Sequence, residues 1–267
     1  MPDHIATVPP PAGGLFRIAR GPESPFSFAD WGRAGADGTF GNRFDDPSGR
    51  DGISPDQRFR VLYCATHLAA AFGETMSRFR VDPALRAALA RIADDEPLDA
   101  AMRGAVDPDF PDHGRLDATW LFRRRIGHVS LPASLRFADV GHASTIQYLN
   151  DCFAADVHAY GLDELDVSAL TSRHRALTQR VARHLYEMKD ASGRPLVAGI
   201  RYISRFGANW ECWAIFEGRI PDLDSMAARS LPIHADTPDL LDVARIFGLS
   251  IETLPESGRY YRPWQDA

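Results

Sequence analysis

Lysine is almost absent from this chain of 267 residues: of its 30 basic residues, only Lys189 is a lysine and the rest are arginines. A phosphate-binding P-loop needs a lysine at the end of GxxxxGK, and the sequence contains no such motif. Lys189 lies in YEMKDASGRP, which predicts a helix end followed by a turn. P-loop, kinase and Schiff-base lysine chemistry are therefore disfavoured.

Cysteine is also scarce, with Cys64, Cys152 and Cys212 far apart and odd in number. This pattern argues against a disulfide framework and favours a reducing compartment. No apolar run approaches the ~20 residues of a membrane span, and the N-terminus lacks the pattern of a secretory signal. We therefore expect a cytoplasmic protein with no membrane partner.

Metal-binding and nucleic-acid-binding patterns are missing too. The nine histidines are scattered, with no HExxH and no CxxC motif, so no metal site is expected. The net charge of -6 lacks the basic footprint of a domain that binds nucleic acid directly. The hydrophobic content of 45% is that of an ordinary globular protein.

The hydrophobic pattern predicts a single α+β domain with a mixed or antiparallel sheet and flanking helices. Residues 1–14 are expected to be disordered or draped over the surface, and residues 220–267 to form a C-terminal extension. Strands are predicted at 15–20, 59–65, 135–140, 196–204 and 212–217, with one or two more within 118–132. Helices are predicted at 67–79, 82–93, 142–153, 171–188 and 239–249.

Two residues near the predicted strand 59–65 are candidates for chemistry. Cys64 precedes a predicted helix N-terminus, whose dipole lowers the pKa of a nearby thiol, and this would suit a thiol enzyme. The competing interpretation, which we favour, is a small buried residue in a strand. Glu74 lies about 120° from the apolar stripe of the helix and faces small residues. Periodicity alone favours a surface i,i+4 pair between Glu74 and Arg78.

Two further segments present arginine or serine at turns. Arg43 lies in GTFGNRFDDP, an aromatic and glycine-flanked loop that suits bidentate phosphate recognition. The alternative is an arginine whose stem covers Phe40 and Phe44. Ser204 and Arg205 end a strand at a hairpin in IRYISRFGANW, which by itself is an ordinary turn.

Taken in order, these residues resemble the RES-domain family, which is named after its Arg, Glu and Ser. The resemblance rests on Arg43 in GNRFDDP, Tyr63 and Glu74 in VLYCATHLAAAFGE, and Ser204 in GIRYISR. LFRIAR, with Arg17, is similar to the opening strand of the family. The similarity spans most of the chain, and on this basis we place the RES domain at residues 15–219.

The resemblance implies an ADP-ribosyltransferase-like fold and an enzyme that consumes NAD by phosphorolysis, hydrolysis or ADP-ribosyl transfer, with NAD as substrate and no cofactor. Glu74 would stabilise an oxocarbenium-like centre, as in glycoside cleavage. Arg43 would clamp the pyrophosphate, and Tyr63 would contact the nicotinamide–ribose end. Ser204 would bind a phosphate oxygen or the incoming nucleophile. Arg17 and Arg205 are secondary anion-binding candidates.

The resemblance also implies the toxin of a type II toxin–antitoxin pair, restrained by an Xre-like antitoxin protein. The alternative from another class is a catalytically silent RES-like module that serves interactions only. The acceptor of the reaction and the oligomeric state, including a homo-oligomer, stay open at this point.

Overall fold

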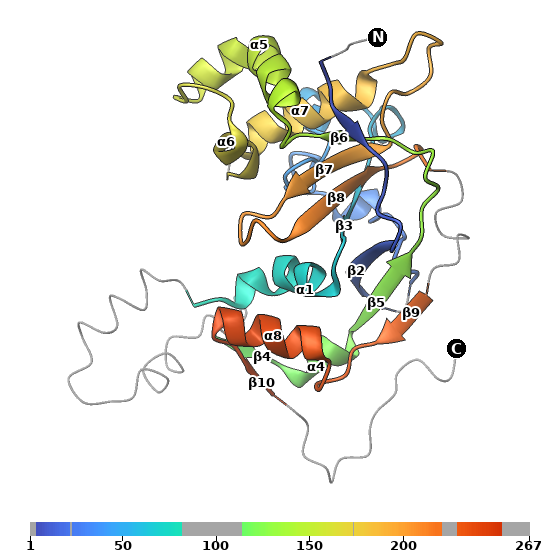
Figure 1. Cartoon of the computed structure of the whole chain (residues 1–267), viewed down its shortest axis with the longest axis vertical. Helices are drawn as coiled ribbons and strands as arrows, with labels where there is room; N and C mark the ends of the chain where they lie inside the picture. Colours follow the sequence, from blue (N-terminus) through green and yellow to red (C-terminus); the bar gives the residue numbers. More distant parts are fainter. Residues whose placement is uncertain (1–3, 22, 82–113, 173, 221–228, 253–267) are drawn as a thin grey trace, which may run out of the picture.

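The protein is described from a computed structural model, in which residues 4–21, 23–81, 114–172, 174–220 and 229–252 are placed (Figure 1). A mixed eight-stranded sheet forms the centre, with strand order β1-β6-β7-β8-β3-β2-β5-β9. Its strands are β1 (Thr7–Val8), β2 (Leu15–Arg20), β3 (Val61–Ala65), β5 (Arg124–Val129), β6 (Phe137–Asp139), β7 (Gly199–Ile203), β8 (Glu211–Phe216) and β9 (Arg229–Pro232). Within this sheet, as far as the described residues form it, β6 and β7 are the only neighbours that pair in parallel. The α+β class is therefore confirmed.

Helices surround the sheet. They are α1 (Leu68–Met76), α4 (Ala118–Phe122), α5 (Ala143–Ala159), α6 (Val167–Thr171), α7 (Arg175–Glu187) and α8 (Pro238–Phe247). Short 3-10 turns occupy Trp31–Arg33, Ser48–Asp51, Pro55–Gln57 and Ser77–Phe79. A separate two-stranded pairing joins β4 (Arg115–Leu116) to β10 (Ser250–Ile251). In Figure 1, α5, α6 and α7 cluster at the end of the molecule near β6 and β7, and α1 lies beside α8.

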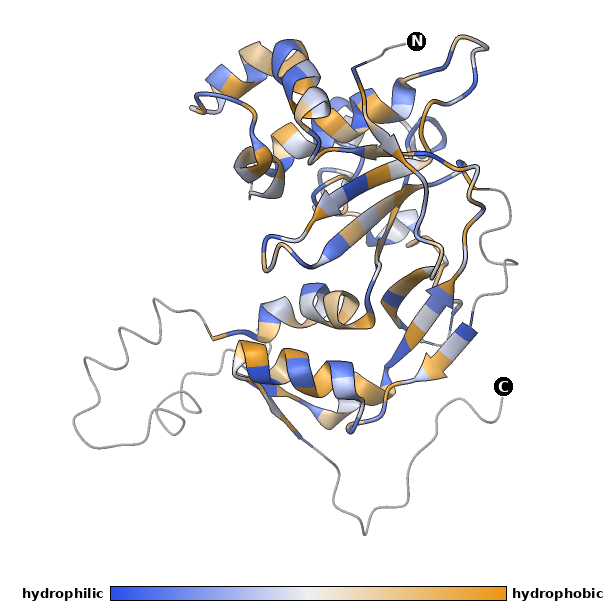
Figure 2. Cartoon of the chain, viewed as in Figure 1, coloured by the Kyte–Doolittle hydropathy of each residue, from blue (hydrophilic) through white to orange (hydrophobic). Residues whose placement is uncertain are grey.

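Strand β8 is buried on both faces, which explains its continuous apolar sequence. Cys212, Ala214 and Phe216 face the larger core, which the helices cover. Trp213 and Ile215 face a second, smaller core on the other side of the sheet. Because successive side chains of a strand point to opposite faces of the sheet, β8 contributes residues to both cores. Figure 2 shows hydrophobic and hydrophilic residues alternating along α5 and α8, as expected of amphipathic surface helices.

The sheet opens between β2 and β3. These neighbours are paired only at Phe16 and Ala65, whereas β2 pairs with β5 along its whole length from Leu15 to Arg20. Strand β3 pairs along its whole length with β8. The sheet is therefore two well-paired halves that meet at one register position and then diverge.

Several sequence predictions need correction. Within 118–132, the first part is helix α4 rather than strand, because the Asp117 side chain accepts a hydrogen bond from the Thr119 N–H and caps it. The helix predicted at 67–79 is α1 from Leu68 to Met76, and the 3-10 turn Ser77–Phe79 follows it. The helix predicted at 171–188 is α7, which begins only at Arg175, and a separate short helix, α6, ends at Thr171.

The chain ends also differ from the expectation. The N-terminal segment contributes β1, which pairs with β6 at the sheet edge, and Ile5 is buried. Beyond residue 220, β9 pairs with β5 in the main sheet and α8 packs against α1. The helix predicted at 82–93 lies outside the described residues.

Candidate active site

A cavity of about 410 Å³ lies where β2 and β3 diverge. Its walls come from β2, the loop before β3, β3 itself, α1, and the start of α7. The charged residues that line it are five arginines and two carboxylates, namely Arg17, Arg43, Arg60, Arg78, Arg175, Asp45 and Glu74. Arg60 is neutralised by an ion pair with Glu217. The excess of guanidinium groups gives the cavity a positive charge that suits an anionic ligand.

Arg43 reaches the cavity from a buried loop. The residue is only 7% exposed, and one of its terminal nitrogens donates to the backbone oxygen of Thr171, at the end of α6, at 2.9 Å. Its Nε is buried and has no hydrogen-bond partner among the described residues. Its guanidinium carbon lies 5.4 Å from the centre of the Tyr202 ring. A buried guanidinium with an unused donor fits a site that receives an anionic ligand.

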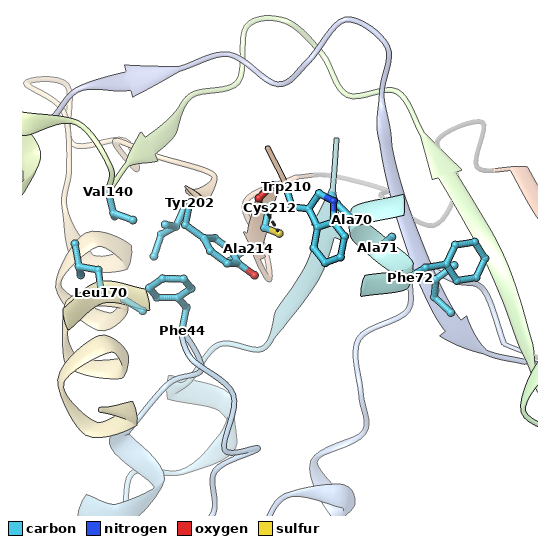
Figure 3. Packing of buried hydrophobic residues seen from close by; sticks show 14 of the residues in the cluster. Phe44, Ala70, Ala71, Phe72, Val140, Leu170, Tyr202, Trp210, Cys212 and Ala214 are labelled. Carbon is cyan, nitrogen blue, oxygen red and sulfur yellow. Dashed lines mark hydrogen bonds between the residues drawn. The ribbon is translucent and has the colours of Figure 1, made fainter. Parts of the chain in front are cut away.

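The neighbouring Phe44 anchors this loop in the core. Its ring is fully buried and lies edge-on to the Tyr202 ring at 5.0 Å, as Figure 3 shows. The alternative interpretation of Arg43, a stem that covers Phe40 and Phe44, does not hold for Phe44, because that ring lies in the core whereas Arg43 lines the cavity.

The Tyr63 hydroxyl ties strand β3 to the Arg43 loop. It donates to an Asp45 carboxylate oxygen at 2.9 Å and accepts from the Phe44 N–H at 2.9 Å. Burial raises the pKa of Tyr63 well above its ordinary value, so the hydroxyl stays neutral. Asp45 in turn accepts from the Asn42 N–H at 2.6 Å, and burial raises the pKa of its carboxyl. Tyr63 therefore fixes the loop conformation that presents Arg43.

Glu74 and Ser204 meet across 130 residues of sequence. The Ser204 hydroxyl donates to Glu74 Oε1 at 2.5 Å and accepts from the Phe206 N–H at 3.1 Å. Ser204 is buried, whereas Glu74 is half-buried and lines the cavity. Among the described residues no ion pair joins Glu74 to Arg78, so the surface-pair interpretation is wrong.

Helix α1 is held in place by the β7–β8 hairpin. A Cβ atom on Gly73 would lie 2.0 Å from the Trp210 ring, so only glycine allows this close approach. The Trp210 backbone oxygen accepts from the Ser204 N–H at 2.8 Å. The same hairpin thus sets the position of α1 and the position of the serine that contacts Glu74.

Two secondary candidates have different surroundings. Arg17 lines the cavity and donates to the backbone oxygens of Pro25 at 2.9 Å and Ser27 at 3.5 Å. Arg205 is exposed, lies over the Phe206 ring at 4.6 Å, and is not among the residues that line the cavity. Ser204 also lies behind the cavity wall and reaches the cavity through Glu74.

The thiol-enzyme hypothesis for Cys64 is wrong on its electrostatic premise. Burial raises the pKa of the Cys64 thiol to about 12, although the nearby Arg17 charge lowers it. The residue is 5% exposed and belongs to the smaller core cluster. A thiol that stays protonated is a poor nucleophile. Cys64 is the small buried strand residue of the competing interpretation.

Sequence analysis missed Arg175, which begins α7 and lines the cavity beside Tyr202. Burial lowers the pKa of Arg175, and the positive charge of Arg43, which lines the same cavity, lowers it further. The arginine-rich polar face of the predicted helix was the available signal. Only the fold shows which of its arginines turns to the cavity.

The described part of the chain contains no cluster of His, Cys, Asp and Glu that could hold a metal ion. None of its helices is both long and apolar enough to cross a membrane.

The fold and cavity define an α+β protein with an arginine-lined site at a split in its sheet, closed on one side by a serine-held glutamate. The model of the RES domain family matches residues 15–239, which is most of the chain. The chain therefore belongs to the RES domain family. No curated protein matches it.

Proposed function

We propose that this RES-domain protein is an enzyme that cleaves the nicotinamide–ribose bond of NAD. The observation that carries the proposal is the Ser204–Glu74 hydrogen bond at the wall of a cavity rich in arginine. An enzyme that cleaves a dinucleotide needs arginines for the anionic pyrophosphate. It also needs a positioned carboxylate for the ribose carbon, which becomes cationic during the reaction. RES family membership supports the same substrate.

In the proposed reaction the bond between ribose C1′ and the nicotinamide nitrogen breaks, and its electron pair stays on the nitrogen. Neutral nicotinamide leaves, an acceptor oxygen forms the new bond to C1′, and an acceptor that carries its proton on that oxygen releases it to the solvent. Positive charge develops on the ribose in the transition state, as in glycoside hydrolysis. The Glu74 carboxylate stabilises that charge. The Ser204 hydroxyl holds the Glu74 carboxylate in one orientation. The side chain therefore loses little conformational freedom when the transition state forms.

Arg43 and Arg175 bind the pyrophosphate in this proposal. Both line the cavity, and the Nε of Arg43 has an unused hydrogen. A guanidinium donates two parallel hydrogen bonds to a phosphate, which a lysine cannot do. Tyr63 and Asp45 hold the Arg43 loop rather than reacting themselves.

An ADP-ribosyltransferase-like fold is part of the same proposal. The divergence of β2 and β3 places a cavity inside a split sheet, where a long ligand has access to both halves. We also propose, as expected from sequence, that residues 15–219 form the catalytic domain and that the protein is cytoplasmic.

The decisive experiment incubates the full chain with NAD and separates the products by mass, with and without inorganic phosphate and with a protein acceptor. Free nicotinamide with ADP-ribose indicates hydrolysis, ADP-ribose phosphate indicates phosphorolysis, and a mass increase on protein indicates transfer. Glu74→Gln is expected to fold normally and to lose several orders of magnitude in turnover. Glu23→Gln, on an exposed glutamate, is the matched control. Wild-type turnover in folded Glu74→Gln would contradict the proposal.

We further propose that the protein acts as the toxin of a type II toxin–antitoxin pair. An enzyme that drains cellular NAD needs restraint, and an Xre-like antitoxin that covers the cavity would supply it. The net charge of -6 favours steering of a basic partner toward this protein. Expression without a partner is expected to lower NAD per cell and arrest growth, and Glu74→Gln to relieve both. A level NAD pool beside accumulating wild-type protein would support the alternative, a silent interaction module.

A further inference from the structure

A second group of arginines lies beside the cavity. Arg20 on β2 and Arg124 on β5 are direct partners in the antiparallel register, so their side chains leave the same face of the sheet. Like charges placed directly opposite each other destabilise a strand pair. The pair therefore has an electrostatic cost.

Aromatic rings connect this pair to the end of α1. The Arg124 guanidinium lies 4.5 Å from the Trp120 ring centre, and the Trp120 ring meets the Phe79 ring edge-on at 6.2 Å. Arg78 lies over the same Phe79 ring at 5.6 Å. We call Arg20, Arg78, Arg124 and the two rings the arginine platform. The rings hold guanidinium groups by cation–π contacts and restrict their motion.

The platform has no acidic counterpart in the described part of the chain. No ion pair there joins Arg20, Arg78 or Arg124 to a carboxylate, whereas the half-buried Arg183, for comparison, pairs with the buried Asp46. Arg124 is only 8% exposed. Burial, together with the positive charges of Arg78, Arg20 and Arg123, lowers its pKa to about 10. A buried cation beside other cations is stabilised by a bound anion.

The platform reaches the candidate active site through Arg78. This residue lines the cavity and follows Glu74 by one helical turn, the spacing at which side chains are neighbours. An anion on the platform would therefore lie next to the part of the cavity that Glu74 serves. Arg20 and Arg124 lie outside the cavity wall and extend the positive surface beyond it.

We propose that the arginine platform is a binding site for a phosphate dianion, separate from the Arg43–Arg175 pair. Two sources carry this group: free inorganic phosphate, and a phosphomonoester borne by a nucleotide, such as the 2′-phosphate of NADP. Several guanidinium groups that converge on a small area match the three oxygens of a phosphate. An indole donor of the platform, Trp120 Nε1, is also buried without a partner among the described residues.

The site stands on its own geometry. Its role in catalysis depends on the proposed function. That role would be either to deliver phosphate to the reacting ribose or to select a phosphorylated nucleotide. Binding is therefore the primary measurement, because it does not require NAD to be cleaved.

The test titrates the full chain by calorimetry with inorganic phosphate, and separately with NAD and NADP. The main variant is Arg20→Gln, because Arg20 is exposed and its loss leaves the core intact. Arg78→Gln tests the link to the cavity. The matched control is Arg125→Gln, which removes the same charge from the adjacent position of β5, where the side chain donates to Ser230 Oγ instead. Thermal melting confirms that each variant is folded.

Saturable binding of inorganic phosphate that weakens about tenfold or more in Arg20→Gln and Arg78→Gln, but not in Arg125→Gln, supports the free-phosphate source. NADP binding that exceeds NAD binding, with the difference lost in the same two variants, supports the nucleotide source. The proposal is overturned if neither phosphate nor NADP shows this behaviour, or if Arg125→Gln loses as much binding as Arg20→Gln and Arg78→Gln. Phosphate binding without NAD cleavage would refute the proposed function and leave the site intact.

Discussion

The Ser204 hydroxyl donates a hydrogen bond to Glu74 Oε1 and joins the β7–β8 hairpin to helix α1. We expect Ser204→Ala to lower kcat by about tenfold to a hundredfold while KM for NAD changes little, because the carboxylate remains but loses its orientation. Steady-state kinetics of nicotinamide release measures both. Ser204→Thr, which keeps a hydroxyl, is expected to recover part of the rate. Unchanged kcat in Ser204→Ala would remove the serine from the site.

Arg43 is expected to bind NAD through the paired N–H donors of its planar guanidinium group, and not through its positive charge alone. Arg43→Lys should weaken NAD binding markedly, and Arg43→Ala should abolish it, because a lysine cannot donate bidentately to the pyrophosphate. Calorimetry on the Glu74→Gln background measures binding without turnover. Arg33→Lys is the control, since Arg33 is exposed and does not line the cavity. Unchanged NAD affinity in both Arg43 variants would reassign Arg43 to structure.

Tyr63 is expected to act through the loop that carries Arg43. Tyr63→Phe deletes the hydroxyl that contacts Asp45 and Phe44, which should cost about 1 kcal/mol of stability or somewhat more. KM for NAD should rise more than kcat falls, because binding by Arg43 is affected before chemistry. Urea unfolding and steady-state kinetics give the two quantities. A fall in kcat alone would instead place the hydroxyl in direct contact with the reacting atoms.

Gly73 is expected to tolerate no side chain. Gly73→Ala would force the Trp210 ring away from α1, and overpacking of this kind costs about 1–3 kcal/mol. Activity should fall as well, because Glu74 is the next residue. Thermal melting and NAD turnover measure the two effects, and Gly13→Ala, where a Cβ meets nothing within 4 Å, is the control. Partial recovery in Gly73→Ala combined with Trp210→Phe would assign the loss to this contact.

The cysteines should differ in reactivity. Cys64 and Cys212 are buried and Cys152 is exposed. Because burial raises the pKa of Cys64 to about 12, it is protonated at all neutral and mildly alkaline pH values, and the thiolate forms only as the pH approaches that value. Iodoacetamide should therefore label Cys152 alone in the folded protein, without loss of NAD turnover. Peptide mapping by mass locates the label. Inactivation that tracks with Cys64 labelling would restore the thiol-enzyme hypothesis.

Local pattern was sufficient for the inner strands β2, β3, β5, β6, β7 and β8, although not for β1 and β9 at the two edges of the sheet. The β-branched and aromatic run before α1 predicted β3, and the apolar stripe with Leu177, Val181 and Leu185 predicted α7. Hydrophobic periodicity predicts these segments because each of them buries one face or lies wholly within the protein core, whichever elements become its neighbours. It failed at α4, where the cap at Asp117 outweighed the strand-like composition that follows.

The sequence by itself determined the α+β class, most of the elements, and the residues Arg43, Tyr63, Glu74 and Ser204 in their order along the chain. Tertiary structure alone decided that β2 and β3 diverge into a cavity, that Arg175 joins Arg43 there, and that Arg20 faces Arg124. The physical reason is that these relationships are made between distant segments. Strand order and register set them, and hydrophobic periodicity carries no information about which strands become neighbours.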